Sequence, residues 1–326
     1  MYADILKFLL ATVAASIPLR FSEVQVFQVG LVPVFIPCDH SIAMAKLILN
    51  LAGTGMIPGK TDNPAVPITP AEIADDCGRC YDLGASIFHL HARDESGQPT
   101  WRPDTFREIV LRVRARCPGA VVGVSTSGRV FKEFAQRAAV LDLDGDAKPD
   151  MASLTLGSLN FPNQASVNDP AMIKALATRM RERGIVPELE IFDFGMLDYA
   201  HYLIEHQILR PPYYFNLLLG SLGTLAATPF SLASLTRGLP SQDSHAKVTW
   251  AGAGIGRFQF FVNALAIAMG GHVRVGLEDN LHLDTHKERL ASNPLLVERL
   301  VRLAHANERE IATPAETRML VGLDPG

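Results

Sequence analysis

Short hydrophobic runs alternate with longer stretches of helical pattern from residue 47 almost to the end of the chain. The runs are rich in β-branched and aromatic residues, and turn residues bound them, as is typical of strands. The pattern predicts eight strands, at residues 47–52, 86–91, 120–125, 151–156, 186–192, 213–219, 248–251 and 273–278.

The stretches between these runs carry helix start and stop signals. Thr69-Pro70-Ala71-Glu72 is a capping box with proline at the first helical position, and Gly84 follows as a stop. Similar signals predict helices over 103–117, 170–184 and 257–269. Strands that alternate with helices over roughly 250 residues predict an α/β fold, a (β/α)8 barrel, with an open doubly wound sheet as the alternative.

The first 43 residues do not share this alternation of predicted strands and helices. Residues 5–17 are as apolar as the core of a signal peptide. Lys7 is the only basic residue there, however, the stretch is too short to span a bilayer, and no clean cleavage site follows. Met44 leads directly into the first predicted strand. We expect residues 1–43 to be an N-terminal extension, added by an upstream start, and residues 44–326 to form the catalytic barrel.

Composition narrows the class of protein and its partners. The chain has 326 residues, of which 48% are hydrophobic and 20% charged, so it can bury a large core. A net charge of -4 predicts no nucleic-acid or membrane partner. The 4 cysteines are too sparse for a disulfide framework, which favours the cytoplasm. Cys77 and Cys80 have the spacing of redox and zinc sites, but their helical context favours packing within a helix.

Two histidines lie at the end of the second predicted strand. His89 and His91 are two residues apart, so they point to the same face and can converge on one metal ion. Such a pair also occurs as ordinary half-buried residues, so a metal site needs a third ligand. The last predicted strand ends in Glu278 and Asp279. Two histidines and a carboxylate form an open site that suits zinc or a related divalent ion.

In a (β/α)8 barrel, the carboxyl ends of all strands meet at one face, where the chemistry gathers. Alternation along the last strand places Arg274 on the same face as Glu278, deeper in the barrel, where a buried guanidinium needs a carboxylate partner. The other polar residues that the prediction brings to this face are Ser125, Thr126, Ser127, Ser153, Thr155, Glu188, Glu190 and Asn216.

Residues 251–257, Ala-Gly-Ala-Gly-Ile-Gly-Arg, follow the seventh predicted strand and open a helix. Their glycine spacing differs from that of a dinucleotide fingerprint. Loops after strands seven and eight are the usual phosphate-binding side of these barrels. The backbone of Gly254 and Gly256, with Arg257 beside it, is therefore a candidate site for a phosphorylated cofactor. A glycine-rich turn that only reverses the chain is the alternative.

From residue 47 to about 320 the chain resembles the β-keto acid cleavage enzymes. The segments that carry the resemblance are 67–72, 89–93, 125–128, 157–161, 187–190, 254–257 and 271–280. The resemblance implies a zinc-containing (β/α)8 barrel in which a β-keto acid and acetyl-CoA give acetoacetate and a new acyl-CoA. It also implies a homo-oligomer, since relatives are commonly homotetramers.

The resemblance also implies roles for individual residues. These are His89, His91 and Glu278 as zinc ligands, Asp279 with Arg274 as an acid–base dyad, Ser125 holding the reacting groups, and Glu190 as a further acidic residue, with Glu188 competing for that role. A zinc ion would act as a Lewis acid on the enolate that forms when Asp279 removes a proton. Arg274 would keep that carboxylate ionised. The enolate would then attack acetyl-CoA, and a retro-Claisen step would release acetoacetate.

Departures from the family pattern concern the substrate. Members that act on an amino-substituted keto acid have a glutamate after the first strand, where this chain has Ile57. An apolar side chain cannot offset an ammonium charge, so we expect an acid whose tail is neutral or apolar, or whose charge is met elsewhere. Ser153 and Thr155 replace threonine and asparagine, so we expect rearranged hydrogen bonds. Thr126 and Asn216 complete the predicted substrate-binding set.

Two other classes of protein remain open at this point. Metal-dependent amidohydrolases also carry a His-x-His motif in a barrel, but on the first strand and with further histidines at later strand ends. Here His201, His206 and His245 fall in helical or loop contexts. The second alternative is a catalytically silent barrel that binds a metal. The complete set of predicted ligands and dyad residues argues against it.

Overall fold

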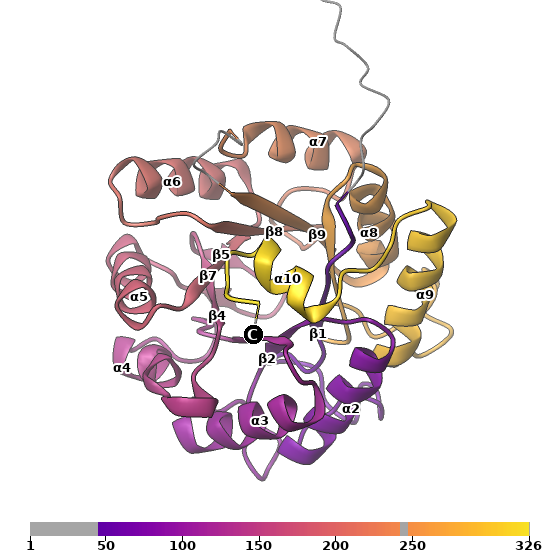
Figure 1. The fold of residues 1–326 in the computed structure, drawn as a ribbon, viewed down its shortest axis with the longest axis horizontal. Helices are drawn as coiled ribbons and strands as arrows, with labels where there is room; N and C mark the ends of the chain where they lie inside the picture. Colours follow the sequence, from indigo (N-terminus) through magenta and orange to yellow (C-terminus); the bar gives the residue numbers. More distant parts are fainter. Residues whose placement is uncertain (1–44, 242–246, 326) are drawn as a thin grey trace, which may run out of the picture. The chain divides into compact units, whose positions relative to one another are not determined.

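The computed structural model of the protein describes residues 45–241 and 247–325 (Figure 1). Eight parallel strands form a closed barrel. In spatial order they are β1 (Leu49–Ala52), β10 (His272–Val275), β9 (Val248–Gly254), β8 (Tyr213–Leu219), β7 (Val186–Ile191), β4 (Met151–Thr155), β3 (Val121–Val124) and β2 (Ile87–Leu90). The barrel closes because β1 pairs with both β10 and β2, with Leu49 opposite Val273 and Ala52 opposite His89. The predicted (β/α)8 barrel is therefore confirmed, and the open sheet is excluded.

Helices surround the strands in Figure 1. They are α2 (Pro70–Asp82), α3 (Pro103–Arg116), α4 (Phe134–Ala138), α5 (Pro170–Arg183), α6 (Phe194–Glu205), α7 (Pro229–Gly238), α8 (Gln259–Ala268), α9 (Asn293–Ala306) and α10 (Pro314–Leu320). The predicted capping box is present at α2, where the Thr69 hydroxyl accepts from the Glu72 N–H and the Glu72 carboxylate accepts from the Thr69 N–H. A short antiparallel pair, β5 (Leu159–Asn160) and β6 (Ala165–Ser166), follows β4.

Strand β9 is longer than predicted and runs to Gly254, through residues that the sequence assigned to a loop. Close packing on the following segment explains its glycines. A Cβ at Gly254 would lie 2.3 Å from the Phe258 carbonyl oxygen, and one at Gly252 would lie 2.7 Å from the Ala266 Cβ. The glycines let the strand approach α8, which a sequence pattern cannot distinguish from a flexible turn.

Strand β10 is shorter than predicted and ends at Val275. Gly276 has a φ of 150°, and a Cβ there would lie 2.0 Å from the Ala52 carbonyl oxygen, so the chain turns out of the sheet at this glycine. The alternation of side chains therefore ends at Val275 and does not extend to Glu278. Arg274 and Glu278 nevertheless meet, because the turn brings Glu278 back over the strand end.

The amino ends of the strands are closed by α10, which lies across the middle of the strands in Figure 1. A cluster of buried residues fills this end: Ile48, Ile87, Val121, Met151, Tyr214, Ala251, Ala312 and Val321. The Ser86 and Thr317 hydroxyls are 2.7 Å apart, and the Thr249 hydroxyl donates to the Leu320 carbonyl. Any cavity for chemistry must therefore lie at the opposite end.

Two predictions from the sequence concern segments away from that end. Cys77 and Cys80 are buried on α2, and burial raises the pKa of both thiols well above the usual value, as fits packing residues. The proposed extension, residues 1–43, lies outside the described residues. Among the described helices, none is long and apolar enough to cross a membrane.

Candidate active site

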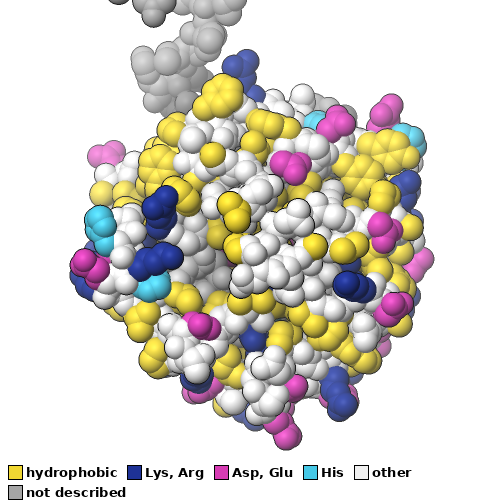
Figure 2. Space-filling model, turned by 180° about the vertical axis from the view of Figure 1, so that it is seen from behind, with side chains coloured by type: hydrophobic (Ala, Val, Ile, Leu, Met, Phe, Trp, Pro, Cys, Tyr) yellow, Lys and Arg dark blue, Asp and Glu magenta, His cyan; other side chains and the backbone are white. Residues whose placement is uncertain are grey.

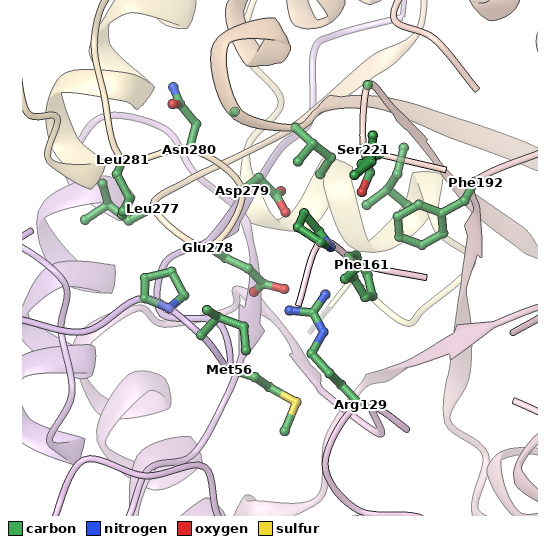
Figure 3. Close-up of a pocket in the computed structure, with 18 of the residues that line it drawn as sticks. Met56, Arg129, Phe161, Phe192, Ser221, Leu277, Glu278, Asp279, Asn280 and Leu281 are labelled. Carbon is green, nitrogen blue, oxygen red and sulfur yellow. The ribbon is translucent and has the colours of Figure 1, made fainter. Parts of the chain in front are cut away.

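A cavity of about 890 Å³ opens at the carboxyl ends of the strands. Figure 2 shows this face of the molecule, with Lys, Arg and His side chains grouped beside a hollow. Figure 3 shows side chains of the wall, including Glu278 and Asp279. The predicted site residues that line the cavity are Ile57, His89, His91, Ser125, Ser153, Thr155, Glu190, Gly256, Arg257, Arg274, Glu278 and Asp279.

The three predicted metal ligands converge in this cavity. One ligand atom of each of His89, His91 and Glu278 lies within 4.8 Å of the other two. The two Nε2 atoms of the histidines are 3.1 Å apart, and His91 Nε2 lies 3.3 Å from a Glu278 carboxylate oxygen. Two nitrogens and an oxygen that point to one spot form the donor set of an open divalent-metal site.

Glu188 orients the first of these histidines from behind. Its carboxylate lies 2.6 Å from His89 Nδ1 and accepts hydrogen bonds from the amides of Asn50 and Asn216. Burial would raise the pKa of Glu188, but the charges of His89 and Arg274 and the hydrogen bonds with His89 and Asn50 lower it to about 2. Although burial opposes it, Glu188 also raises the pKa of His89 to about 9. A carboxylate at Nδ1 leaves Nε2 facing the cavity, as metal-ligating histidines require.

Arg274 lies at the centre of a cluster of charged side chains beside the histidines. Its guanidinium donates to Asp279 at 2.9 Å, to Glu278 at 2.8 Å and to Glu190 at 3.3 Å, and its side chain is 2% exposed. Burial raises the pKa of Asp279, and Arg274 opposes that rise. Burial likewise raises the pKa of Glu190. The buried guanidinium thus has the carboxylate partners that the sequence predicted, three in place of one.

Buried polar residues of the neighbouring segments fix the loop that carries Glu278. The Glu278 N–H donates to the Ala52 carbonyl. Asn293, at the start of α9, accepts from the Leu277 N–H at 2.8 Å and donates to the Gly53 carbonyl and to Asp76. These hydrogen bonds join the loops after β1 and β10, so Glu278 is held by a network that links distant parts of the sequence.

Arg93 holds the loop that carries Ile57. This buried arginine donates to the carbonyls of Gly55, Pro58 and Gly97. Its three hydrogen bonds fix the loop after β1 against the segment after β2. Ile57 therefore has a defined place on the cavity wall, with 51% of its surface exposed.

Hydroxyl groups from β3 and β4 form another part of the wall. Thr155 donates to the Glu190 carboxylate at 2.5 Å. Ser153 accepts from the Thr126 N–H, and the Thr126 hydroxyl donates to the Ser153 carbonyl. Thr126 is buried and does not line the cavity. Its hydroxyl instead joins the ends of two neighbouring strands.

Two other predicted residues also lie away from the cavity wall. Asn216 is buried and donates a hydrogen bond to Glu188. Gly254 packs against the Phe258 backbone and does not line the cavity. The Gly256 N–H donates to the Asp279 carbonyl at 2.7 Å, so it is committed within the protein. The third residue of the predicted phosphate site is Arg257. Its exposed side chain forms no hydrogen bond or ion pair with the residues that the structure describes.

Arg129 lines the same cavity, although it was not among the residues predicted from the sequence. Its guanidinium carbon lies 3.5 Å from the centre of the Phe161 ring. Burial lowers the pKa of Arg129, while the charges of Glu278, Glu190 and Asp279 oppose that shift. Its position just after the Ser-Thr-Ser-Gly segment, at the end of a barrel strand, was the available signal in the sequence.

A closed (β/α)8 barrel with a convergent His, His and Glu set, next to a buried arginine–carboxylate cluster, has the architecture of a barrel enzyme with a metal site. The chain belongs to the beta-keto acid cleavage enzyme family, whose model matches residues 46–323. It is an enzyme of the acyl-CoA transferase type.

Named relatives cover almost the whole described chain. A 3-keto-5-aminohexanoate cleavage enzyme of Fusobacterium nucleatum is 41% identical over 282 residues, which cover 86% of this chain and 99% of the relative. A 3-oxoadipate:acetyl-CoA acetyltransferase of Cupriavidus necator is 36% identical over 277 residues, which cover 85% and 94%. The apo structure of ObcA is 23% identical, with a TM-score of 0.70 over 80% of this chain and 66% of that one, and it supports the fold alone.

Proposed function

We propose that the protein is a zinc-dependent enzyme that converts a β-keto acid without a 5-amino group, together with acetyl-CoA, into acetoacetate and a new acyl-CoA. The observation that carries the proposal is the shared cavity wall. His89, His91 and Glu278 face the same space as the Arg274–Asp279 pair. A Lewis-acid site and a positioned base are the two parts that removal of a proton next to a ketone requires.

The residues present suit zinc. The Glu278 Oε2 atom is buried and has no hydrogen-bond partner within the described part of the chain, although it lies 3.3 Å from His91 Nε2. A buried carboxylate oxygen without a donor is costly, and a cation between it and the two imidazoles would satisfy it. Bound there, zinc would supply Lewis acidity to the oxygens of the keto acid.

The base of the reaction is Asp279. Its two carboxylate oxygens accept from Nε and Nη2 of Arg274, at 2.9 and 3.3 Å, and this fixes the plane of the carboxylate. Asp279 lines the cavity next to Glu278, so it can take a proton from the carbon between the carboxylate and the ketone of the substrate. The hydroxyls of Ser125, Ser153 and Thr155 lie on the wall, where they can orient the oxygens of the reactants.

Acetyl-CoA enters from the rim of the cavity. Arg257 and Lys287 line the cavity with exposed side chains, and His286 lies beside Lys287. Exposed cations at the mouth suit the phosphates of CoA, and the phosphate contacts come from these side chains rather than from the Gly256 backbone. The buried carboxylates deeper in the cavity would repel a phosphate, which leaves that region to the keto acid.

An amino-substituted acid is a poor match for this cavity. Ile57 presents an apolar surface on the wall, so it offers no charge to an ammonium group. The relative from Cupriavidus necator is named for 3-oxoadipate, which has no amino group. We therefore propose that the substrate tail carries no ammonium group.

Acetoacetate formation tests the proposal. Zinc-loaded protein is incubated with acetyl-CoA and a panel of β-keto acids, and acetoacetate and the new acyl-CoA are quantified together. Equimolar formation of both from an acid without an amino group is expected. Efficient turnover of 5-amino-3-oxohexanoate would contradict the substrate assignment. Free acetate without acetoacetate would indicate a hydrolase, and no turnover of any acid would indicate a metal-binding barrel.

A further inference from the structure

The half-buried Arg129 differs from the buried arginines of the described residues because its side chain has no hydrogen-bond or ion-pair partner among them. Arg93, Arg137 and Arg309 donate to backbone carbonyls, and Arg274 pairs with three carboxylates. The Arg129 side chain makes no hydrogen bond or ion pair with any residue that the structure describes, and its Nε atom is buried without an acceptor. A guanidinium in this state has a strong need for an anion.

The surroundings of Arg129 fix where that anion would lie. Figure 3 shows its guanidinium directed toward Glu278, with Phe161 against it and Met56 close to its stem. Glu190, Asp279 and one oxygen of Glu278 accept from Arg274, and none of the three carboxylates forms a hydrogen bond or ion pair with Arg129. The guanidinium carbon lies 3.5 Å from the centre of the Phe161 ring, so the ring covers one side of a group that lines the cavity.

We propose that Arg129 binds a second carboxylate, at the far end of the β-keto acid, so that the preferred substrate is a β-keto dicarboxylic acid. This inference rests on the function proposed above. The planar fork of a guanidinium matches a carboxylate with two parallel hydrogen bonds. Met56, Ile57 and Leu277 line the same cavity and provide apolar surface for the methylene groups between the two ends of the acid.

The other anionic groups of the reactants have sites elsewhere. The first carboxylate of the keto acid lies beside the base and the metal ligands, as the chemistry requires. The phosphates of CoA meet the exposed Arg257 and Lys287 at the rim, whereas Arg129 is half buried. A tail carboxylate is the remaining anion that needs a cation inside the cavity. The same guanidinium would repel a tail ammonium group, in agreement with the absence of a carboxylate at Ile57.

A binding measurement without acetyl-CoA tests the inference. The ligands are 3-oxohexanedioate and 3-oxohexanoate, which have the same number of carbons and differ in a terminal carboxylate. Their affinities for the zinc-loaded protein are measured by calorimetry for the wild type, R129M and R129K. R302M, which removes an exposed arginine of α9, is the matched control.

We expect R129M to weaken binding of the diacid about 100-fold and binding of the monoacid less than threefold, because only the diacid loses its charged partner. R129K should recover part of the affinity for the diacid, since it keeps the charge without the fork. An equal loss for both acids would show that Arg129 contacts their shared keto acid group. Unchanged affinity for the diacid would show that Arg129 does not bind it. Either result would overturn the inference.

Turnover separates this inference from the proposed function. If the diacid binds through Arg129 but no acid yields acetoacetate, the proposed reaction fails and the role of Arg129 stands. If acetoacetate forms with 3-oxohexanoate as efficiently as with the diacid, the proposed reaction stands and the preference for a diacid is wrong.

Discussion

The same eight strands form both ends of the barrel, but apolar residues are buried at one end and charged residues at the other. At the amino end, α10 covers an apolar cluster that includes Ile48 and Val321. At the carboxyl end, four buried or half-buried carboxylates surround two histidines and Arg274. Apolar burial stabilises a fold directly, whereas buried charges rarely do so. The apolar cluster at the amino end therefore contributes to stability, whereas the carboxyl end carries the groups suited to chemistry.

The largest effect should follow from Glu278→Gln at the charged end. The change keeps the size of the side chain but removes the anionic ligand of the candidate metal site. We expect kcat/KM to fall about 1000-fold, which corresponds to ~4 kcal/mol, and the metal content of the purified protein to fall with it. Steady-state kinetics and metal analysis measure both. Glu298→Gln, on the surface of α9, is the control, and an active, metal-loaded E278Q would refute the role of Glu278.

Ile48→Ala tests the apolar end. Ile48 is 0% exposed within the cluster under α10, so its truncation leaves a cavity. We expect the free energy of unfolding to fall by about 3 kcal/mol in denaturant titrations, while kcat/KM stays within about twofold of the wild type. The control is Leu111→Ala on α3, where the side chain is 41% exposed. A large loss of activity in a folded I48A protein would show that the two ends are not separable.

Asn293→Ala should affect both stability and activity, because it supports the charged end through backbone contacts. It deprives the Leu277 N–H and the buried Asp76 carboxylate of a partner. We expect a loss of about 2 kcal/mol in stability and a roughly tenfold lower kcat/KM, since Leu277 directly precedes Glu278, the proposed metal ligand. Asn307→Ala, at the exposed end of α9, serves for comparison. If N293A loses stability but keeps the kcat/KM of the wild type, other contacts position the loop of Glu278.

The smallest effect concerns acid sensitivity at the amino end. His272 Nδ1 accepts from the Ile48 N–H at 3.0 Å, and burial, with the Arg309 charge, lowers the pKa of His272 from 6.5 to about 3. The unfolded chain therefore binds a proton that the folded protein excludes. This stabilising contribution is fully present above pH 6.5 and is lost as the pH falls toward 3, by about 1.4 kcal/mol per pH unit.

His272→Asn keeps an acceptor near the position of Nδ1 but cannot be protonated. We expect the wild type to lose about 1 kcal/mol more stability than H272N between pH 7.0 and 5.5, as measured by urea unfolding at both values. The difference isolates His272 from the other titrating groups. Equal pH dependence of the two proteins would show that His272 is not the acid-sensitive group.

Periodicity and helix signals were sufficient to predict the barrel, because the signals of strands and caps are local. The predicted start of α2 at the Thr69 capping box is confirmed. The predicted ends of β9 and β10 were wrong. Gly254 and Gly276 are required by close contacts with Phe258 and Ala52, and the hydrophobic pattern of the sequence does not reveal these contacts. A glycine in a sequence is equally typical of a turn and of a close approach between two segments of the chain.

The candidate site likewise contains residues that could be predicted from the sequence and residues that only the structure reveals. His89 and His91 could be paired from their spacing, and Glu278 and Arg274 from their place at the end of the last strand. The role of Glu188 behind His89 could not be separated from that of Glu190, because both lie on β7 two residues apart and share a face. Arg129 was missed because its lack of a partner is visible only in three dimensions.

Return of zinc to metal-depleted protein tests whether the cavity holds a catalytic metal ion. The protein is treated with a chelator, zinc is added back in steps, and acetoacetate formation from acetyl-CoA and a β-keto acid is followed at each step. We expect activity to rise in proportion to zinc and to level off at one ion per chain, with no recovery in E278Q. Full activity in the metal-depleted protein would contradict the account.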